Sequence, residues 1–96
     1  MQKIIVNNIE YELVKNYRNA YDENAFLNRY TDYFEPYDYV VGDIAYSSLR
    51  LKGFYKSNNK KVKKINNIDN VDQYLKDNCA VDCKYFILKK LDSEKK

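Results

Sequence analysis

The opening of the chain constrains the fold most strongly, because its turn and its apolar pattern agree on one β-hairpin. Asn7 and Asn8 separate two runs of alternating apolar residues, 3–6 and 9–15. Asn tolerates the positive φ angles that a two-residue type I′ turn requires. A two-residue turn fixes the register of the two strands, and in that register the apolar residues of both strands lie on one face. The predicted cross-strand pairs are Val6 with Ile9, Ile4 with Tyr11, and Lys3 with Glu12.

An amphipathic helix is expected next. Asp22 suits the N-cap position, and Glu23 favours the positive end of the helix dipole. Apolar residues then recur at intervals of three and four, which is typical of one buried helix face, and Pro36 ends the pattern. The predicted apolar stripe consists of Phe26, Leu27, Tyr30, Tyr33 and Phe34.

The second half of the chain repeats this alternation of strands and a helix. Residues 37–41 read as a strand that ends at Gly42-Asp43, and residues 49–56 as a half-buried strand with a largely cationic outer face. Residues 57–67 have the composition of an exposed loop. Asp69 is expected to cap a second helix with Val71, Tyr74, Leu75 and Cys79 on its buried side, and residues 84–91 form a final strand.

The order β-β-α-β-β-α-β predicts an α+β fold, with an antiparallel or mixed sheet of about five strands and two helices against one side of it. Residues 1–91 are expected to form a single domain, followed by a solvated tail, 92–96. Gly42 and Gly53 are the only glycines, and each lies in or beside a strand. We therefore predict a positive φ, a bulge or a close backbone approach at one of them.

Charge is distributed unevenly along the chain. Residues 22–43 carry six acidic side chains against Arg29 alone, whereas residues 44–68 carry seven basic side chains and no acidic one. Such asymmetry favours a surface that meets a polyanion, and it also suits head-to-tail self-association.

The basic segment is the leading candidate for a binding surface. Its cations could contact phosphates or an acidic protein, and aromatic side chains beside them could stack on unpaired bases. The alternative is an ordinary solvated strand and a Lys-rich loop, because Lys also protects edge strands from aggregation. The candidate residues are Arg50, Lys52, Phe54, Lys56, Lys60, Lys61, Lys63 and Lys64, with Tyr39 and Tyr46 nearby.

The chain contains no histidine, which excludes catalytic sites of the Ser-His-Asp and Cys-His types. Cys79 and Cys83 form a C-x₃-C pair that suits buried packing or a thiol redox switch, but with no histidine they cannot complete a four-ligand zinc site in one chain. A metal-dependent enzyme would have to use carboxylates. The candidates for that role are Asp32, Glu35, Asp38 and Asp43.

Three blocks of this sequence are distinctive: YDYVVGD (37–43), LRLKGFYK (49–56) and CAVDCKYFILKK (79–90). In order and spacing they resemble the bacterial YutD-like family, and VKNYRNAYDENAF (14–26) is compatible with it. The resemblance spans roughly residues 9–90. Ile44 and Ala45 depart from it, because an aromatic residue and a glycine follow the GD in the family. The resemblance implies a small cytoplasmic bacterial domain without assigning an activity to it.

We therefore expect a non-enzymatic adaptor or regulatory domain that binds a protein, or RNA or the ribosome, through the basic segment. A redox-responsive protein that uses Cys79 and Cys83 is the alternative, and a metal-dependent enzyme is the third reading. We expect no cofactor. A cytoplasmic location is expected, because the N-terminal residues lack the roughly 7–15-residue apolar run of a signal peptide. No membrane partner is expected, because no segment approaches the ~20 apolar residues of a spanning helix.

Overall fold

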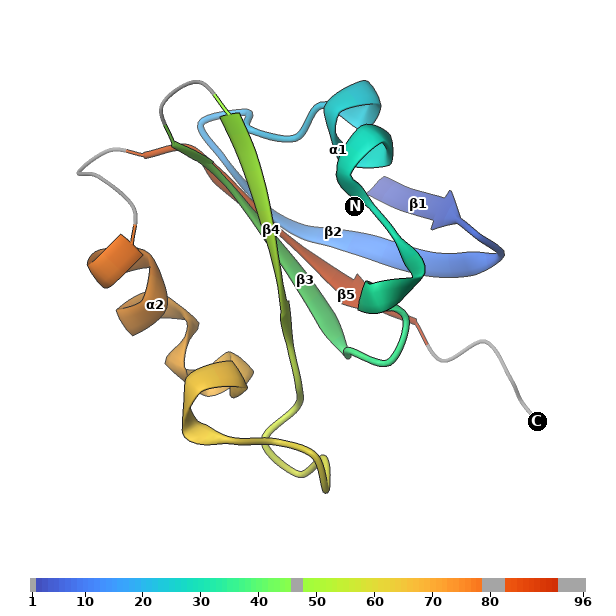
Figure 1. Ribbon diagram of the computed structural model, residues 1–96. Coiled ribbons are helices and arrows are strands. Elements are labelled where there is room, and N and C mark those ends of the chain that lie inside the picture. The colour runs from blue at the N-terminus through green and yellow to red at the C-terminus, as the bar shows by residue number, and fades with distance from the viewer. Residues whose placement is uncertain (1, 46–47, 79–82, 92–96) are drawn as a thin grey trace.

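The computed structural model describes residues 2–45, 48–78 and 83–91, and its strands form one antiparallel sheet. The strands are β1 (Gln2–Val6), β2 (Ile9–Tyr17), β3 (Tyr39–Ala45), β4 (Ser48–Phe54) and β5 (Tyr85–Lys90). Their spatial order is β1-β2-β5-β3-β4, so the last strand of the sequence lies in the middle of the sheet (Figure 1). With two α-helices in the described part, the predicted α+β class is confirmed.

The predicted N-terminal hairpin is confirmed residue by residue. Val6 lies opposite Ile9, Ile4 opposite Tyr11, and Lys3 opposite Glu12. Asn7 and Asn8 have φ angles of 52° and 66°, as the type I′ turn requires. The apolar face is buried, with Ile4, Tyr11 and Leu13 in the main core. The register was predictable because it depends only on the turn and on side chains a few residues away.

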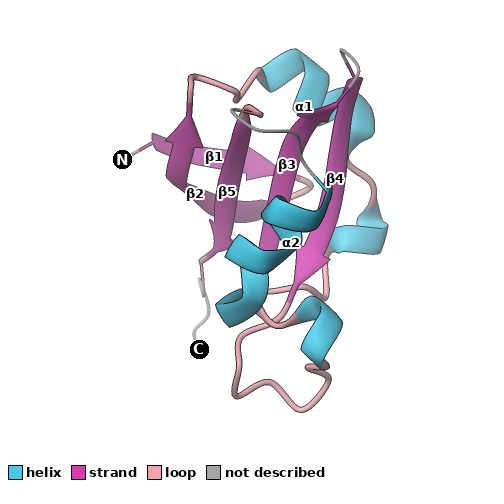
Figure 2. Cartoon of the chain, turned by 90° about the vertical axis from the view of Figure 1, so that its left-hand side faces the viewer, coloured by secondary structure: helices cyan, strands magenta, loops and turns pink. Residues whose placement is uncertain are grey.

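The two helices cover opposite faces of the sheet, which corrects the expectation that both pack on one side. They are α1 (Glu23–Arg29) and α2 (Val71–Asn78). Figure 2 shows α2 lying across β3 and β4 with α1 behind the sheet. Neighbouring residues of a strand point to opposite faces, so Val40 joins the α1-side core whereas Val41 packs with Leu75 of α2. Neither helix has the length and apolar character needed to cross a bilayer, nor does any other helix in the described ranges.

Helix α1 is shorter than its apolar stripe predicted. Asp22 caps it, accepting a hydrogen bond from the Ala25 backbone N–H at 3.3 Å. The chain then becomes extended at Tyr30, and a separate 3₁₀ turn, Asp32–Phe34, begins beyond it. This break rotates Tyr33 away from the core, so that 63% of it is exposed. The ring of Phe34 stays buried.

The second half of the chain also differs from its predicted boundaries. Strand β3 continues through Gly42-Asp43, which were expected to end it. Asp69 does not cap α2 but lies inside a 3₁₀ turn, Ile68–Asn70, whose N-cap is Asn67. Helix α2 starts directly after that turn.

Both glycines mark places where an aromatic ring lies directly against a strand. Neither has a positive φ, but the ring of Phe86 covers Gly42 and the ring of Tyr37 covers Gly53. A Cβ at either position would fall inside the van der Waals radius of that ring. The prediction of a close approach is therefore confirmed, and the absence of a side chain is what lets each ring pack there.

We expect Gly42→Ala to destabilise the fold by roughly 1–3 kcal/mol, because it overpacks a core whose Phe86 ring is fully buried. Urea unfolding measures the change. In the Phe86→Leu variant, which lacks the ring, Gly42→Ala should lower the free energy of unfolding by less. An equal cost in both backgrounds would contradict the assigned contact.

Candidate functional site

Helix α2 covers part of the strand face that was expected to be the cationic outer surface. Phe54 is completely buried beneath it, and its ring centroid lies 5.5 Å from that of Tyr74. Lys52 is half-buried, with its Nζ 5.4 Å from the Phe54 ring centroid and 5.7 Å from that of Tyr74. The ammonium group therefore engages ring faces inside the molecule. Phe54 is not a stacking platform, which corrects its predicted role.

Arg50 connects β4 to both β3 and the end of α2. Its Nη2 atom lies 2.5 Å from Oδ2 of Asp43 and 2.7 Å from the backbone oxygen of Asn78. Asp43 is only 1% exposed, so its carboxylate depends on this guanidinium for charge compensation. Asp43 was predicted at the end of a strand and as a candidate metal ligand, but it is a buried ion-pair partner inside β3. Arg50 therefore has a structural contact that was not predicted, and its side chain, which was predicted to bind a partner, stays 45% exposed.

Replacing Arg50 by Met should destabilise the fold by about 3 kcal/mol, because a buried carboxylate would lose its counter-charge. We expect the double variant Asp43→Asn/Arg50→Met to be less destabilised than Arg50→Met alone, since the uncompensated charge is then removed. Chemical denaturation of the two variants and the parent chain measures this order. The reverse order would show that Arg50 stabilises the fold by something other than pairing with Asp43.

The candidate cations other than Arg50 and Lys52 lie on the loop 56–64, called the basic loop below. Its five lysines are exposed, and none of them pairs with a carboxylate among the described residues. They are Lys56, Lys60, Lys61, Lys63 and Lys64. Four of these lysines were predicted in an exposed loop, 57–67, and Lys56 at the end of the preceding strand; β4 ends at Phe54, so Lys56 belongs to the loop too.

Polar side chains give the basic loop a defined shape. Asp38 accepts hydrogen bonds from the backbone N–H of Lys56 at 2.8 Å and from the side chain of Asn59 at 2.9 Å. A bridge between Tyr55 and Asn67 closes the base of the loop. Asp38 therefore acts as a positioning residue for the lysines. It was predicted only as a carboxylate for metal binding.

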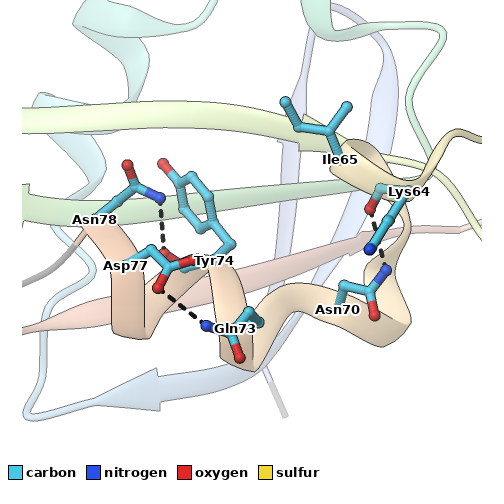
Figure 3. A pocket seen from close by; sticks show the side chains of 7 residues that line it. All are labelled: Lys64, Ile65, Asn70, Gln73, Tyr74, Asp77 and Asn78. Carbon is cyan, nitrogen blue, oxygen red and sulfur yellow. Dashed lines mark hydrogen bonds between the residues drawn. The ribbon is translucent and has the colours of Figure 1, made fainter.

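A pocket of about 430 Å³ lies between the end of the basic loop and α2. Figure 3 shows the side chains that line it, with Lys64 and Asp77 toward opposite ends and Tyr74 between α2 and the sheet. The lining comprises Lys64, Ile65, Asn70, Gln73, Tyr74, Asp77 and Asn78. Burial raises the pKa of the Tyr74 hydroxyl, and the Asp43 carboxylate raises it further whereas Arg50 opposes this, so the ring lines the pocket in its neutral form.

The pocket was not predicted from sequence. Ile65 is an apolar residue that is 72% exposed, and it belongs to a 3₁₀ turn, Lys64–Asn66. Its position in a polar Asn/Lys-rich stretch was the only signal, and no periodicity accompanied it. The contact between that turn and α2 arises from the folded arrangement, which local patterning does not encode.

Two of the other candidate residues, Tyr39 and Cys83, lie in the described part of the chain. Tyr39 is half-buried beneath α2, far along β3 from the Asp43 ion pair. Cys83 is half-buried and disulfide-bonded. Tyr46 and Cys79 lie outside the described residues, as does the predicted tail 92–96.

The geometry does not support the hypothesis that carboxylates form a metal site. Asp38 holds the basic loop and Asp43 pairs with Arg50, so these two side chains serve separate structural contacts. Within the described ranges, no three side chains of the metal-ligating types His, Cys, Asp and Glu come together in one group. What the surface offers is a set of exposed cations beside a mainly apolar pocket.

Fold and surface together define a small α+β domain whose most distinctive exposed feature is a basic loop. A family model described as "Putative antitoxin YutD-like" matches residues 5–89. The chain belongs to this YutD-like family, as the resemblance of its sequence blocks predicted.

Two comparisons with individual proteins agree with that assignment. The *Bacillus subtilis* (strain 168) protein named "Putative antitoxin YutD" is 42% identical over 88 residues, which cover 92% of this chain and 97% of that protein. The solution NMR structure of protein yutD from *B. subtilis* superimposes with a TM-score of 0.82 at 38% identity, covering 100% of this chain and 87% of that chain.

Proposed function

We propose that this domain is a non-enzymatic adaptor that binds a protein partner with an acidic surface through the basic loop. The observation that carries the proposal is the set of five exposed lysines within nine residues, held in place by Asp38 and Asn59. Clustered cations of this kind steer an oppositely charged partner and select its orientation.

A protein partner fits this surface better than RNA does. Binding of unpaired bases needs exposed aromatic rings next to the cations, and Phe54 is buried under α2. Arg50 and Lys52 are also engaged internally, with Asp43 and with two aromatic rings. In place of a stacking platform, the basic loop adjoins a mainly apolar pocket, and a charged rim around an apolar centre is typical of protein interfaces.

The name of the *B. subtilis* relative supports a binding role. That protein is described as a putative antitoxin, a word for a protein that acts against a toxin. We extend to this chain only the expectation that it works by binding another macromolecule.

Charge reversal on the basic loop tests the proposal. We expect Lys60→Glu/Lys61→Glu/Lys63→Glu to weaken capture of the partner at least tenfold, because attraction becomes repulsion across the interface. The measurement is capture by the immobilised full chain from a lysate of the cells that make it, with nuclease treatment and identification of bound proteins by mass spectrometry.

Arg29→Glu/Lys15→Glu/Lys84→Glu is the matched control, because it changes the net charge equally at exposed cations outside the basic loop. The control should retain the same partner as the parent chain. Equal losses in both triple variants would contradict the proposed site. Capture that disappears after nuclease treatment, with RNA in the untreated eluate, would replace the protein partner by RNA.

A further inference from the structure

We infer that the pocket beside the basic loop seats an apolar side chain of the acidic partner segment, with the segment's carboxylates on the Lys64 side. This inference rests on the proposed function and specifies the partner's chemistry. It rests on three properties of the pocket: its lining is mainly apolar, its amide side chains donate hydrogen bonds within the protein, and its two ends carry opposite charges.

Three amide side chains around the pocket each donate a hydrogen bond within the protein. Gln73 donates to Asp77 at 2.9 Å, and the side chain of Asn78 donates to the backbone oxygen of Tyr74 at 2.9 Å. Asn70 donates to the backbone oxygen of Lys64 at 3.0 Å. These bonds are drawn in Figure 3. An apolar group that enters the pocket therefore meets amide groups that already donate one hydrogen bond each within the protein.

Ile65 gives the pocket an apolar wall with no partner of its own. It is 72% exposed, in a Lys/Asn-rich stretch whose only other apolar residue is Val62. A partner side chain placed between Ile65 and the Tyr74 ring would bury apolar surface on both, which is the ordinary source of an interface hot spot.

The two ends of the pocket differ in charge and so orient the segment. Lys64 lies at one end and continues into the other lysines of the basic loop, whereas Asp77 lies at the opposite end. Acidic residues of a bound segment are attracted toward Lys64 and repelled from Asp77. The complementary ligand is therefore a peptide with an apolar residue that has Asp or Glu on one side of it.

Selection from a random decapeptide library on the immobilised full chain tests this inference. Peptides that bind should share an apolar residue flanked on one side by Asp or Glu. Ile65→Ser should weaken their binding about tenfold, measured by fluorescence anisotropy, because the apolar wall is lost. Leu27→Ser is the matched control, since Leu27 is 43% exposed on α1 across the sheet, and it should leave the affinity unchanged. Amide NMR spectra establish that both variants keep the fold.

The outcomes separate this inference from the proposed function. Acidic peptides without an apolar residue, bound equally by the parent chain and by Ile65→Ser, would overturn the pocket and leave the basic loop as the binding surface. Apolar peptides without acidic enrichment would overturn the inferred orientation. Selected peptides that bind the Lys60→Glu/Lys61→Glu/Lys63→Glu variant as tightly as the parent chain would overturn the proposed function itself.

Discussion

Helix α2 lies over the β3–β4 side of the sheet, and this contact divides the basic segment into an engaged part and an exposed part. The engaged part is held by Asp43, which accepts a charged hydrogen bond from Arg50, while Arg50 also donates to the last carbonyl of α2. Phe54 and Lys52 complete the contact through the Tyr74 ring. Lys52 is half-buried by this contact and Arg50 keeps 45% of its side chain exposed, whereas the lysines beyond β4 are exposed and have no such contact with α2 among the described residues.

The same contact creates the pocket. Helix α2 begins directly after the 3₁₀ turns that follow the basic loop, so the loop's last lysine and the helix face each other across a short connection. The Asp43–Arg50 ion pair therefore affects the pocket, because Arg50 also donates a hydrogen bond to the backbone oxygen of Asn78 at the end of α2. Stability and proposed binding are physically linked through this helix, whereas the α1-side core is independent of it.

Sequence reasoning succeeded where the determining contacts are local. The hairpin register depends on Asn7, Asn8 and side chains within a few residues, and it was predicted pair by pair. It failed to predict which face of the sheet each helix covers. An alternating strand such as β4 has two faces, and its pattern cannot say that α2 will cover the one bearing Lys52 and Phe54. The end of α1 was missed because Thr31 caps a new turn, which outweighed the continuing apolar stripe.

The same distinction between local contacts and contacts distant in sequence applies to the candidate site. The lysines of the basic loop were predicted because an exposed charged loop needs no tertiary partner, but the roles of Arg50, Asp43 and Asp38 depend on residues distant in sequence. Ile65 shows the limit most clearly, since its role in the pocket depends on α2 lying beside it, which the sequence around Ile65 does not indicate.

Brief acetylation of the folded chain, followed by mass spectrometry of each lysine, tests most directly the division between engaged and exposed cations. The account predicts fast modification of Lys56 and Lys60 to Lys64, slow modification of Lys52, and protection confined to the basic loop when the captured partner is bound. Modification of Lys52 as fast as that of Lys56, or partner protection on the α1 side of the sheet, would contradict it.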